Sequence, residues 1–377
     1  LSSNDNTYKA IVDLIERFHD AKTFGSLIEV PNSFEAPLKT LLEVLSGLID
    51  SGDTMQKTAA RQLLPIVQQA WVLAQRYNAV IANPPYMGSK GMNKALKDYA
   101  KKTYPNSKSD LFAIFMEHAF SLLAPLGYNA QINMQSWMFL SSFEKLREWL
   151  LSNTTIITMA HLGGRAFDSI SGEVVSATAF VMEKIAKPKY YGNYLRLVDG
   201  KCEAEKSASL REAAQSRDCS WAYEAKPSDL VKIPGRPIAY WIDDVTYNNF
   251  ISMGAIGDIA EIKVGMHTGS NEIFVRYWHE VSFCNIQLSC KSNQESINFD
   301  VKWYPYNKGG QWRKWYGNRD LVVNWRNEGE DIHRFHGLPK DYNGAPVRAK
   351  KYQFKESITW SDIATTKFAA RYSPAGS

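Results

Sequence analysis

Three amphipathic segments, with apolar residues three and four positions apart, open the chain. This spacing predicts helices over residues 8–21, 34–50 and 55–76. The pattern then changes, because a short apolar run at 77–82 has the length of a buried strand and ends in two prolines. Residues 1–75 are therefore interpreted as a helical segment that leads into an α/β domain.

Strands and helices alternate after the prolines. Apolar and amphipathic runs predict strands at residues 129–134, 155–162, 174–183 and 190–198 and helices at 109–120 and 143–151. A short turn containing proline joins the last two strands, which are expected to pair as a hairpin. Residues 76–198 are therefore interpreted as one α/β domain with helices between its first three strands.

A polar segment follows the predicted sheet. Residues 199–240 are rich in charged side chains and contain three prolines, which is typical of a linker or a crossing segment. From Trp241 onward the pattern mixes helical and strand character, so residues 241–377 are interpreted as the beginning of a second, mixed α/β domain. Because the first residue is Leu1 rather than Met, the chain is expected to be a fragment or a processed form.

The segment with the clearest chemistry is Asn83-Pro84-Pro85-Tyr86, which follows the first predicted strand. Neither proline has an N–H for a strand ladder and both fix φ, so the loop is rigid. Ligands of open α/β sheets bind at the carboxyl ends of the strands. The Asn83 amide and the proline carbonyls can accept both N–H bonds of a planar substrate's amino group, while Tyr86 offers an aromatic face. If these four residues are considered without their neighbours, the alternative interpretation is a surface turn stiffened by proline.

Together with its neighbours, this tetrapeptide resembles the motif of the N6-adenine DNA methyltransferases. The order of the elements also matches. A helix that begins at Ser109, a strand and then the segment 165–168 follow the tetrapeptide. Class I, gamma-ordered members of this family have the same order from their fourth motif to their eighth. The resemblance implies the C-terminal half of a class I, Rossmann-like methyltransferase sheet. It also implies S-adenosylmethionine as the methyl donor.

The same resemblance assigns roles to single residues. It implies that residues 83–86 are catalytic and that the rings of Tyr86 and Phe167 stack on a flipped adenine. An aromatic side chain at the position of Phe115 lines the adenine pocket of the donor in this family. Asp110, at the start of the same helix, is expected as the helix N-cap and as a neighbour of that cofactor pocket.

Separated blocks further along the chain resemble PglX, the methyltransferase of the BREX phage-resistance system. These blocks lie at residues 263–271, 305–310, 313–318, 354–361 and 368–372. The resemblance covers nearly the whole chain and implies a site-specific adenine methyltransferase that acts on double-stranded DNA in the cytoplasm. It further implies other defence-system proteins as partners and residues 241–377 as the start of a target-recognition domain.

The glycine-rich turn that holds S-adenosylmethionine in this class of enzyme is not found before Asn83. Such a turn follows the first strand and lets the backbone approach the cofactor, whereas Gly25 and Gly52 stand in isolated turns. PglX-type proteins carry a long helical insert at this place, and residues 1–75 are interpreted as its end. The main cofactor turn is therefore expected upstream of Leu1.

Positive charge is concentrated at one end of the chain. The net charge is +5, yet residues 301–377 hold 14 Lys and Arg against 7 Asp and Glu, while the other 300 residues hold 30 against 32. Five tryptophans are interleaved with these cations, a combination that suits DNA phosphates and bases. Lys308, Arg313, Lys314 and Arg319 are the candidate phosphate contacts. A solvated basic face over an aromatic core is the alternative.

Other classes of function are less favoured. Longer apolar stretches end well short of the ~18 residues of a transmembrane helix, and no signal peptide is visible, so no membrane partner is expected. The four cysteines match no zinc pattern, which predicts free thiols and no metal site. A protein-glutamine methyltransferase can use the same tetrapeptide, although the basic residues 241–377 disfavour it. A non-catalytic DNA-recognition or scaffold subunit also stays open.

Overall fold

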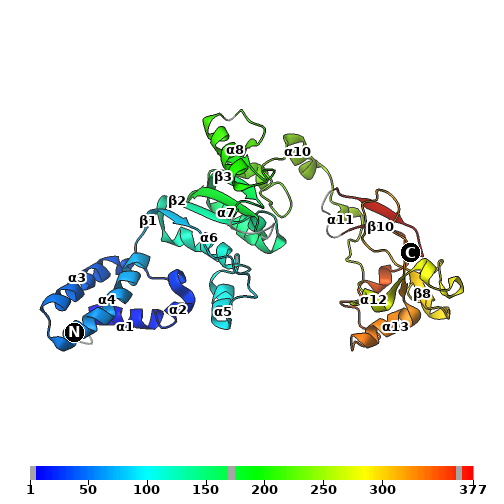
Figure 1. The fold of residues 1–377 in the computed structure, drawn as a ribbon, viewed down its shortest axis with the longest axis horizontal. Coiled ribbons are helices and arrows are strands. Elements are labelled where there is room, and N and C mark those ends of the chain that lie inside the picture. The colour runs from blue at the N-terminus through cyan, green and yellow to red at the C-terminus, as the bar shows by residue number, and fades with distance from the viewer. Residues whose placement is uncertain (1–5, 169–174, 217, 362–366, 377) are drawn as a thin grey trace. The chain divides into compact units, whose positions relative to one another are not determined.

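The computed structural model describes residues 6–168, 175–216, 218–361 and 367–376. The chain forms two compact units, Leu1–Gly254 and Ala255–Ser377. Figure 1 shows a helical part and then a sheet with helices in the first unit, and short helices and strands in the second. No helix in the described ranges combines the length and the apolar character needed to cross a membrane.

The helical part contains α1 (Asn6–Arg17), α2 (Ala21–Phe24), α3 (Glu35–Ser51) and α4 (Thr54–Ala74). α3 and α4 pack together through leucines and alanines at helical spacing. The Asp53 side chain accepts from the Gln56 N–H at 2.8 Å, and the Gln56 side chain accepts from the Asp53 N–H at 3.0 Å. This reciprocal capping box starts α4. The three predicted helices are confirmed, with small shifts at their ends.

The sheet of the first unit has six strands in the order β1-β2-β4-β3-β5-β6. They are β1 (Tyr77–Ala82), β2 (Leu123–Met134), β3 (Thr155–Gly163), β4 (Ala177–Glu183), β5 (Gly192–Arg196) and β6 (Ala222–Ala225). β1 is parallel to β2 and β3 to β5, whereas β4 runs antiparallel to both of its neighbours. The carboxyl ends of β1, β2, β3 and β5 therefore share one edge, and the predicted α/β fold class is confirmed.

The hairpin predicted for β4 and β5 is wrong. β4 lies between β2 and β3, and β5 pairs with the opposite side of β3. The side chains of β4 suit its inner place, because Phe180 and Met182 lie in the main core on one face and Ala179 and Val181 are half-buried on the other. A proline turn between two strands says that the chain reverses, but it does not say which strand becomes the neighbour.

Three helices connect the first three strands, and two of them pack on the sheet. α6 (Leu111–Leu122) is apolar on nearly all sides, as a buried helix must be, and packs on β2. α7 (Glu144–Asn153) contributes to the same core. α5 (Lys94–Thr103) packs against the end of the helical part, where the Tyr99 hydroxyl donates to the Leu27 carbonyl at 2.9 Å.

Regular structure continues through residues 199–240, where the sequence predicts a linker or a crossing segment. This stretch contains α8 (Glu203–Gln215), the strand β6 and α9 (Pro227–Leu230). β6 pairs antiparallel with β5 and so forms the last strand of the sheet. α10 (Asp244–Ser252) follows and closes the first unit.

The second unit has a three-stranded antiparallel sheet of order β7-β9-β8 and a two-stranded ribbon, β10-β11. Its strands are β7 (Val275–Tyr277), β8 (Trp303–Pro305), β9 (Leu321–Asn324), β10 (Ser357–Trp360) and β11 (Ala370–Ser373), and its helices are α11 (Ile256–Ile259), α12 (Asn271–Phe274) and α13 (Arg326–Phe335). Tyr304, Val323 and Trp325 are central to its core.

Candidate active site at the carboxyl edge of the sheet

The NPPY loop (residues 83–86) begins directly after β1 at the edge where the parallel strands end. Asn83 and Pro85 are exposed, Pro84 is buried and Tyr86 is half-buried. Pairing between β1 and β2 stops at Ala82, because the two prolines that follow have no N–H to donate. The sequence therefore places an exposed amide at the mouth of the sheet on a backbone with little freedom.

Tyr86 is fixed from two sides. Its hydroxyl donates to the Ile132 carbonyl of β2 at 3.3 Å, and its ring meets that of Phe112 edge-on, with centroids 6.0 Å apart. Burial raises the pKa of the Tyr86 hydroxyl, so it remains a neutral hydrogen-bond donor at physiological pH. The ring position is thus determined by β2 and α6 as well as by the loop itself.

The segment after the NPPY loop is attached to the start of α6. Asp110 accepts from the Met87 N–H at 3.0 Å and from the Phe112 N–H at 3.3 Å, both through Oδ1. The Leu111 N–H in turn donates to the Met87 carbonyl at 2.9 Å. Asp110 is therefore the N-cap of α6, as predicted, and at the same time the clamp that holds the motif loop.

Phe115 lies one turn further along α6. It is half-buried and packs with the cluster that contains Leu27, Met92, Leu96 and Tyr104, on the side of α5 and the helical part. α6 thus carries both residues for which the resemblance implies a place beside the cofactor.

A ladder of buried amides on β2, which sequence reasoning missed, runs alongside this helix. Asn129, Gln131 and Asn133 alternate along the strand and so face the same side. The Gln131 amide donates to Asn129 Oδ1 at 2.9 Å, and the Asn133 amide donates to Gln131 Oε1 at 3.1 Å. Asn129 anchors the series by donating to the Met116 carbonyl of α6 at 3.2 Å. The sequence does contain a signal for this ladder, since three amide side chains stand at alternate positions of one predicted strand.

The ladder ends near the carboxyl edge with an acceptor that has no protein partner. Asn133 Oδ1 is buried and makes no hydrogen bond in the described structure. Buried polar atoms are satisfied in the great majority of cases, so this oxygen marks a polar position beside the edge. Gln131 is paired across the strands with Ala82, the residue just before Asn83, which links the ladder to the NPPY loop.

A second polar network surrounds His161 near the end of β3. Its ring nitrogens lie 2.6 Å from Gln135 Oε1 and 3.1 Å from the Tyr240 hydroxyl, and its ring stacks on Trp241 at 6.2 Å. Burial, followed by the charges of Arg196 and Lys206, lowers the pKa of His161 to about 4. His161 is thus a neutral, packed side chain at physiological pH.

Phe167 is half-buried and follows β3 at the same edge as the NPPY loop. The chain turns there at Gly163, whose φ of +68° and contact with Val198 leave no room for a Cβ atom. The Asp168 carboxylate next to it accepts from the Glu203 N–H at the start of α8, at 3.1 Å. Phe167 therefore lies on the same edge of the sheet as the NPPY loop, with β2 and β4 between their strands, and α8 supports the turn that carries it.

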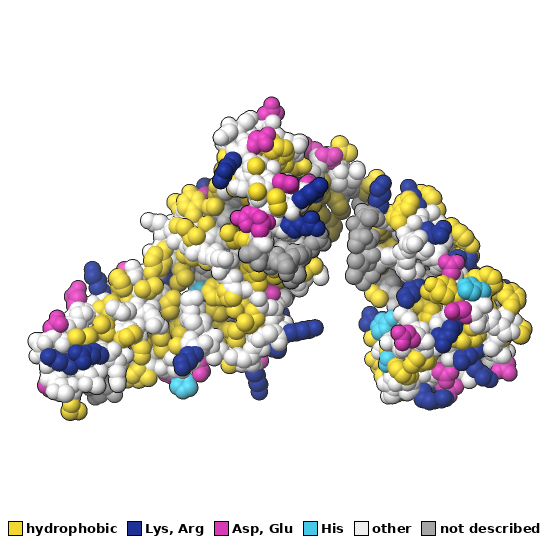
Figure 2. All heavy atoms as spheres, viewed as in Figure 1, with side chains coloured by type: hydrophobic (Ala, Val, Ile, Leu, Met, Phe, Trp, Pro, Cys, Tyr) yellow, Lys and Arg dark blue, Asp and Glu magenta, His cyan; other side chains and the backbone are white. Residues whose placement is uncertain are grey.

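The four candidate phosphate contacts lie together in the loop between β8 and β9 of the second unit. Lys308, Arg313 and Lys314 are exposed and Arg319 is half-buried. Lys314 Nζ lies 4.6 Å from the centre of the Trp315 ring. Figure 2 shows further Lys and Arg side chains spread over the visible face of this unit, with Asp and Glu among them.

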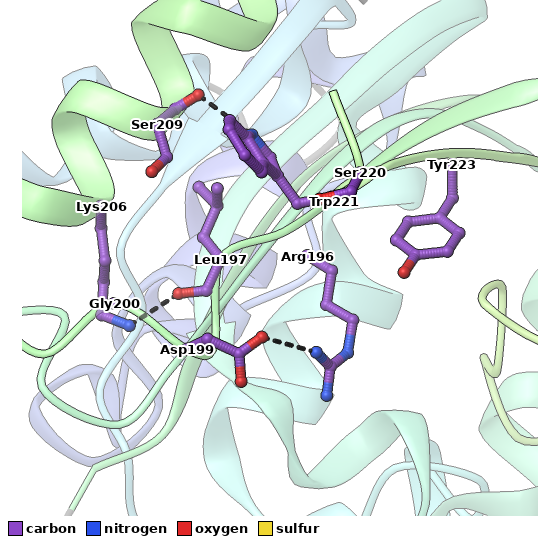
Figure 3. Close-up of a pocket in the computed structure, with 9 residues that line it drawn as sticks. All are labelled: Arg196, Leu197, Asp199, Gly200, Lys206, Ser209, Ser220, Trp221 and Tyr223. Atoms are coloured by element: carbon purple, nitrogen blue, oxygen red, sulfur yellow. Dashed lines mark hydrogen bonds and ion pairs between the residues drawn. The ribbon is translucent and has the colours of Figure 1, made fainter. Parts of the chain in front are cut away.

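A cavity of about 150 Å³ opens at the end of β5 and contacts α8. Figure 3 shows the Arg196 guanidinium directed at Asp199, which it meets at 2.8 Å, and Lys206 directed at the Leu197 carbonyl at 2.7 Å. Lys206 also donates to the Leu162 carbonyl at 2.7 Å. Both cations are therefore already bound by groups of the protein and are not available to a ligand. We interpret this cavity as a gap left where α8 packs near the end of β5.

A six-stranded α/β sheet with the NPPY loop at its carboxyl edge is the arrangement that the resemblance to class I methyltransferases predicts. Comparison with known proteins agrees. The family model "Eco57I restriction-modification methylase" matches residues 20–167.

Two relatives match the chain along nearly all of its length. It is 47% identical to the adenine-specific methyltransferase BrxX of Escherichia coli O9:H4 (strain HS), over 100% of this chain and 30% of that protein. It is 40% identical to the adenine-specific methyltransferase PglX of Lacticaseibacillus casei (strain Zhang), over 97% of this chain and 30% of that protein. The chain is thus homologous to PglX-type methyltransferases, as the resemblance predicts, and spans about 30% of their length.

Proposed function

We propose that this chain carries the catalytic half and the start of the recognition domain of a site-specific adenine DNA methyltransferase in a phage-defence system. The observation that carries the proposal is the NPPY loop, held at the carboxyl edge of the sheet by Tyr86 on one side and by Asp110 on the other. The names of the two homologues support the same activity. The other proteins of such a system are proposed partners.

The geometry suggests how the loop acts on an adenine that has been flipped out of the duplex. The Asn83 side-chain oxygen and the Pro84 carbonyl accept the two N–H bonds of the N6 amine and direct its lone pair outward. Tyr86 and Phe167 hold the base by its faces. The nitrogen forms a bond to the methyl group while the sulfur–carbon bond of the donor breaks. The proton that the amine loses passes to water, so no strong base is needed.

S-adenosylmethionine is the proposed donor and supplies an electrophilic methyl group. The described residues suit one side of its site: Asp110 stands beside the motif with one carboxylate oxygen engaged, and Phe115 is half-buried on the same helix. We propose that these two residues flank the donor and that its main glycine-rich turn is supplied by residues outside this chain.

The test is Asn83→Ala in the full-length natural protein. Methylation of adenine, measured by mass spectrometry of digested DNA, should disappear because the transition state loses an acceptor for the amine. DNA affinity should stay nearly unchanged, since Asn83 is exposed and supports no other element. Asn153→Ala is the matched control, an exposed asparagine on α7 whose side chain reaches only the Trp149 carbonyl. Unchanged methylation in Asn83→Ala would refute the assignment.

A further inference from the structure

The loop between β8 and β9 exposes three large aromatic side chains in close succession. Trp312, Trp315 and Tyr316 are 52%, 69% and 60% exposed. The strands on either side pair antiparallel, and the Tyr306 N–H donates to the Leu321 carbonyl at 2.9 Å, which closes the base of the loop. Exposed aromatic side chains that gather in one loop are typical of surfaces that bind a partner.

The backbone beneath Trp315 is held rigidly in an unfavourable conformation. Its φ is +75°, a region that tryptophan rarely adopts. The Trp315 N–H donates to the Ala370 carbonyl at 2.9 Å, and the Trp315 carbonyl accepts from the Tyr372 N–H at 2.8 Å, so the loop is bound to β11 on both sides of this residue. Strained positions persist where the surrounding structure enforces them, and they cluster at functional sites.

Cations accompany the rings. Lys314 lies over Trp315 at 4.6 Å, and Arg319 lies over Tyr316 at 5.6 Å and donates to its hydroxyl at 2.9 Å. Residues 301–319 contain five Lys and Arg and no Asp or Glu. The loop therefore presents aromatic faces and positive charges together, and its one acidic side chain, Asp320, stands at its end beside β9.

We propose that Trp315 and Tyr316 form a preformed platform that contacts the sugars and base edges of duplex DNA, while Lys314 and Arg319 bind the neighbouring phosphates. The proposal rests on DNA as the substrate and names the surface that engages it. Charge complementarity selects DNA as the partner, and the rigid backbone lowers the entropy lost when the rings bind. The two kinds of contact differ in their response to salt, because only the cations release counterions.

The experiment measures binding of the 377-residue chain to a fluorescein-labelled DNA duplex by anisotropy at several salt concentrations. Trp315→Ala should raise Kd by about 5-fold or more, with an unchanged salt slope, because it removes an aromatic contact and leaves every phosphate-binding cation in place. Lys314→Gln should flatten the log–log slope by about 0.9. Phe283→Ala is the control, since Phe283 is 66% exposed in the same unit but lies outside the loop, and its Kd should be that of the wild type.

Trp315→Phe distinguishes the loss of an aromatic contact with DNA from a disturbance of the loop structure. It keeps an aromatic face at the strained position and should retain most of the affinity, while Trp315→Ala loses it. Equal Kd values for Trp315→Ala and Phe283→Ala would overturn the proposal, and so would equal reductions of affinity in Trp315→Ala and Trp315→Phe. Because binding is measured without a methyl donor, this result is independent of the Asn83→Ala test. Either one can fail while the other succeeds.

Discussion

Replacing Asp110 tests whether the clamp between the NPPY loop and α6 is real. Asp110→Ala removes the oxygen that accepts from both Met87 and Phe112. Loss of an N-cap costs typically ~1 kcal/mol. The second bond, from a half-buried loop, adds a similar amount, so the total is about 2 kcal/mol. For a unit of this size the melting temperature should fall by about 4–8 °C.

Asp110→Asn is the matched variant. It keeps an oxygen at the capping position and removes only the charge, so its stability should stay within about 1 kcal/mol of the wild type. The assay is thermal unfolding followed by circular dichroism, together with methylation by the full-length protein. Methylation should fall more in the alanine variant, because the motif loop loses its attachment. If the alanine and asparagine variants unfold at the same temperature, the clamp does not contribute as argued.

The same pair of proteins gives a pH dependence. Burial raises the pKa of Asp110 above its ordinary value, although backbone hydrogen bonds oppose the shift. The folded state therefore binds the proton more tightly than the unfolded state, and the stabilisation is lost as pH rises through the folded-state pKa. The wild type should gain stability relative to Asp110→Asn on acidification from neutral pH. A constant difference between them across this range would contradict the burial of the carboxylate.

Three further predictions follow from the site. Phe167→Ala should weaken capture of a flipped adenine, and Tyr86→Ala should weaken it more, since stacking is worth ~1–3 kcal/mol per base. The assay is the fluorescence of 2-aminopurine at the target position, and an undiminished signal in both variants would exclude the proposed pocket. Calorimetry should show weak or no binding of S-adenosylmethionine to the 377-residue chain, and micromolar binding would mean that its main site lies within these residues. Replacing Lys308, Arg313, Lys314 and Arg319 together with Gln should lower affinity for all DNA sequences alike. It should also flatten the salt slope by about 0.9 for each phosphate that is no longer neutralised, whereas a wild-type slope would place the DNA surface elsewhere.

The sequence predicts the elements of the first unit well, because their periodicities are long and regular. The strand before Asn83, the helices α3, α4 and α6 and the α/β class all follow from spacing alone. Strand neighbours do not follow, since hydrophobic alternation gives the buried faces of β4 but not its place in the order.

The side chains that support the candidate site could not be predicted from the sequence either. Gln135, His161 and Tyr240 are far apart in the chain, and each alone is an ordinary polar residue. Only the fold shows that they share one network. Asp110 could be predicted as a cap because capping is local, whereas its bond to Met87 depends on a loop 23 residues away.

The amide ladder on β2 has a consequence for how the sheet assembles. Shifting β2 by one residue against β1 would turn Asn129, Gln131 and Asn133 to the opposite face, away from α6, and the bonds from Asn129 to the Met116 carbonyl and from Gln131 to the Phe115 carbonyl would be lost. Leaving even one such amide unpaired costs more than most single contacts provide. An all-aliphatic strand would tolerate the slip far better. The ladder thus acts as a register lock, and because Gln131 pairs with Ala82, the residue whose position it secures is Asn83.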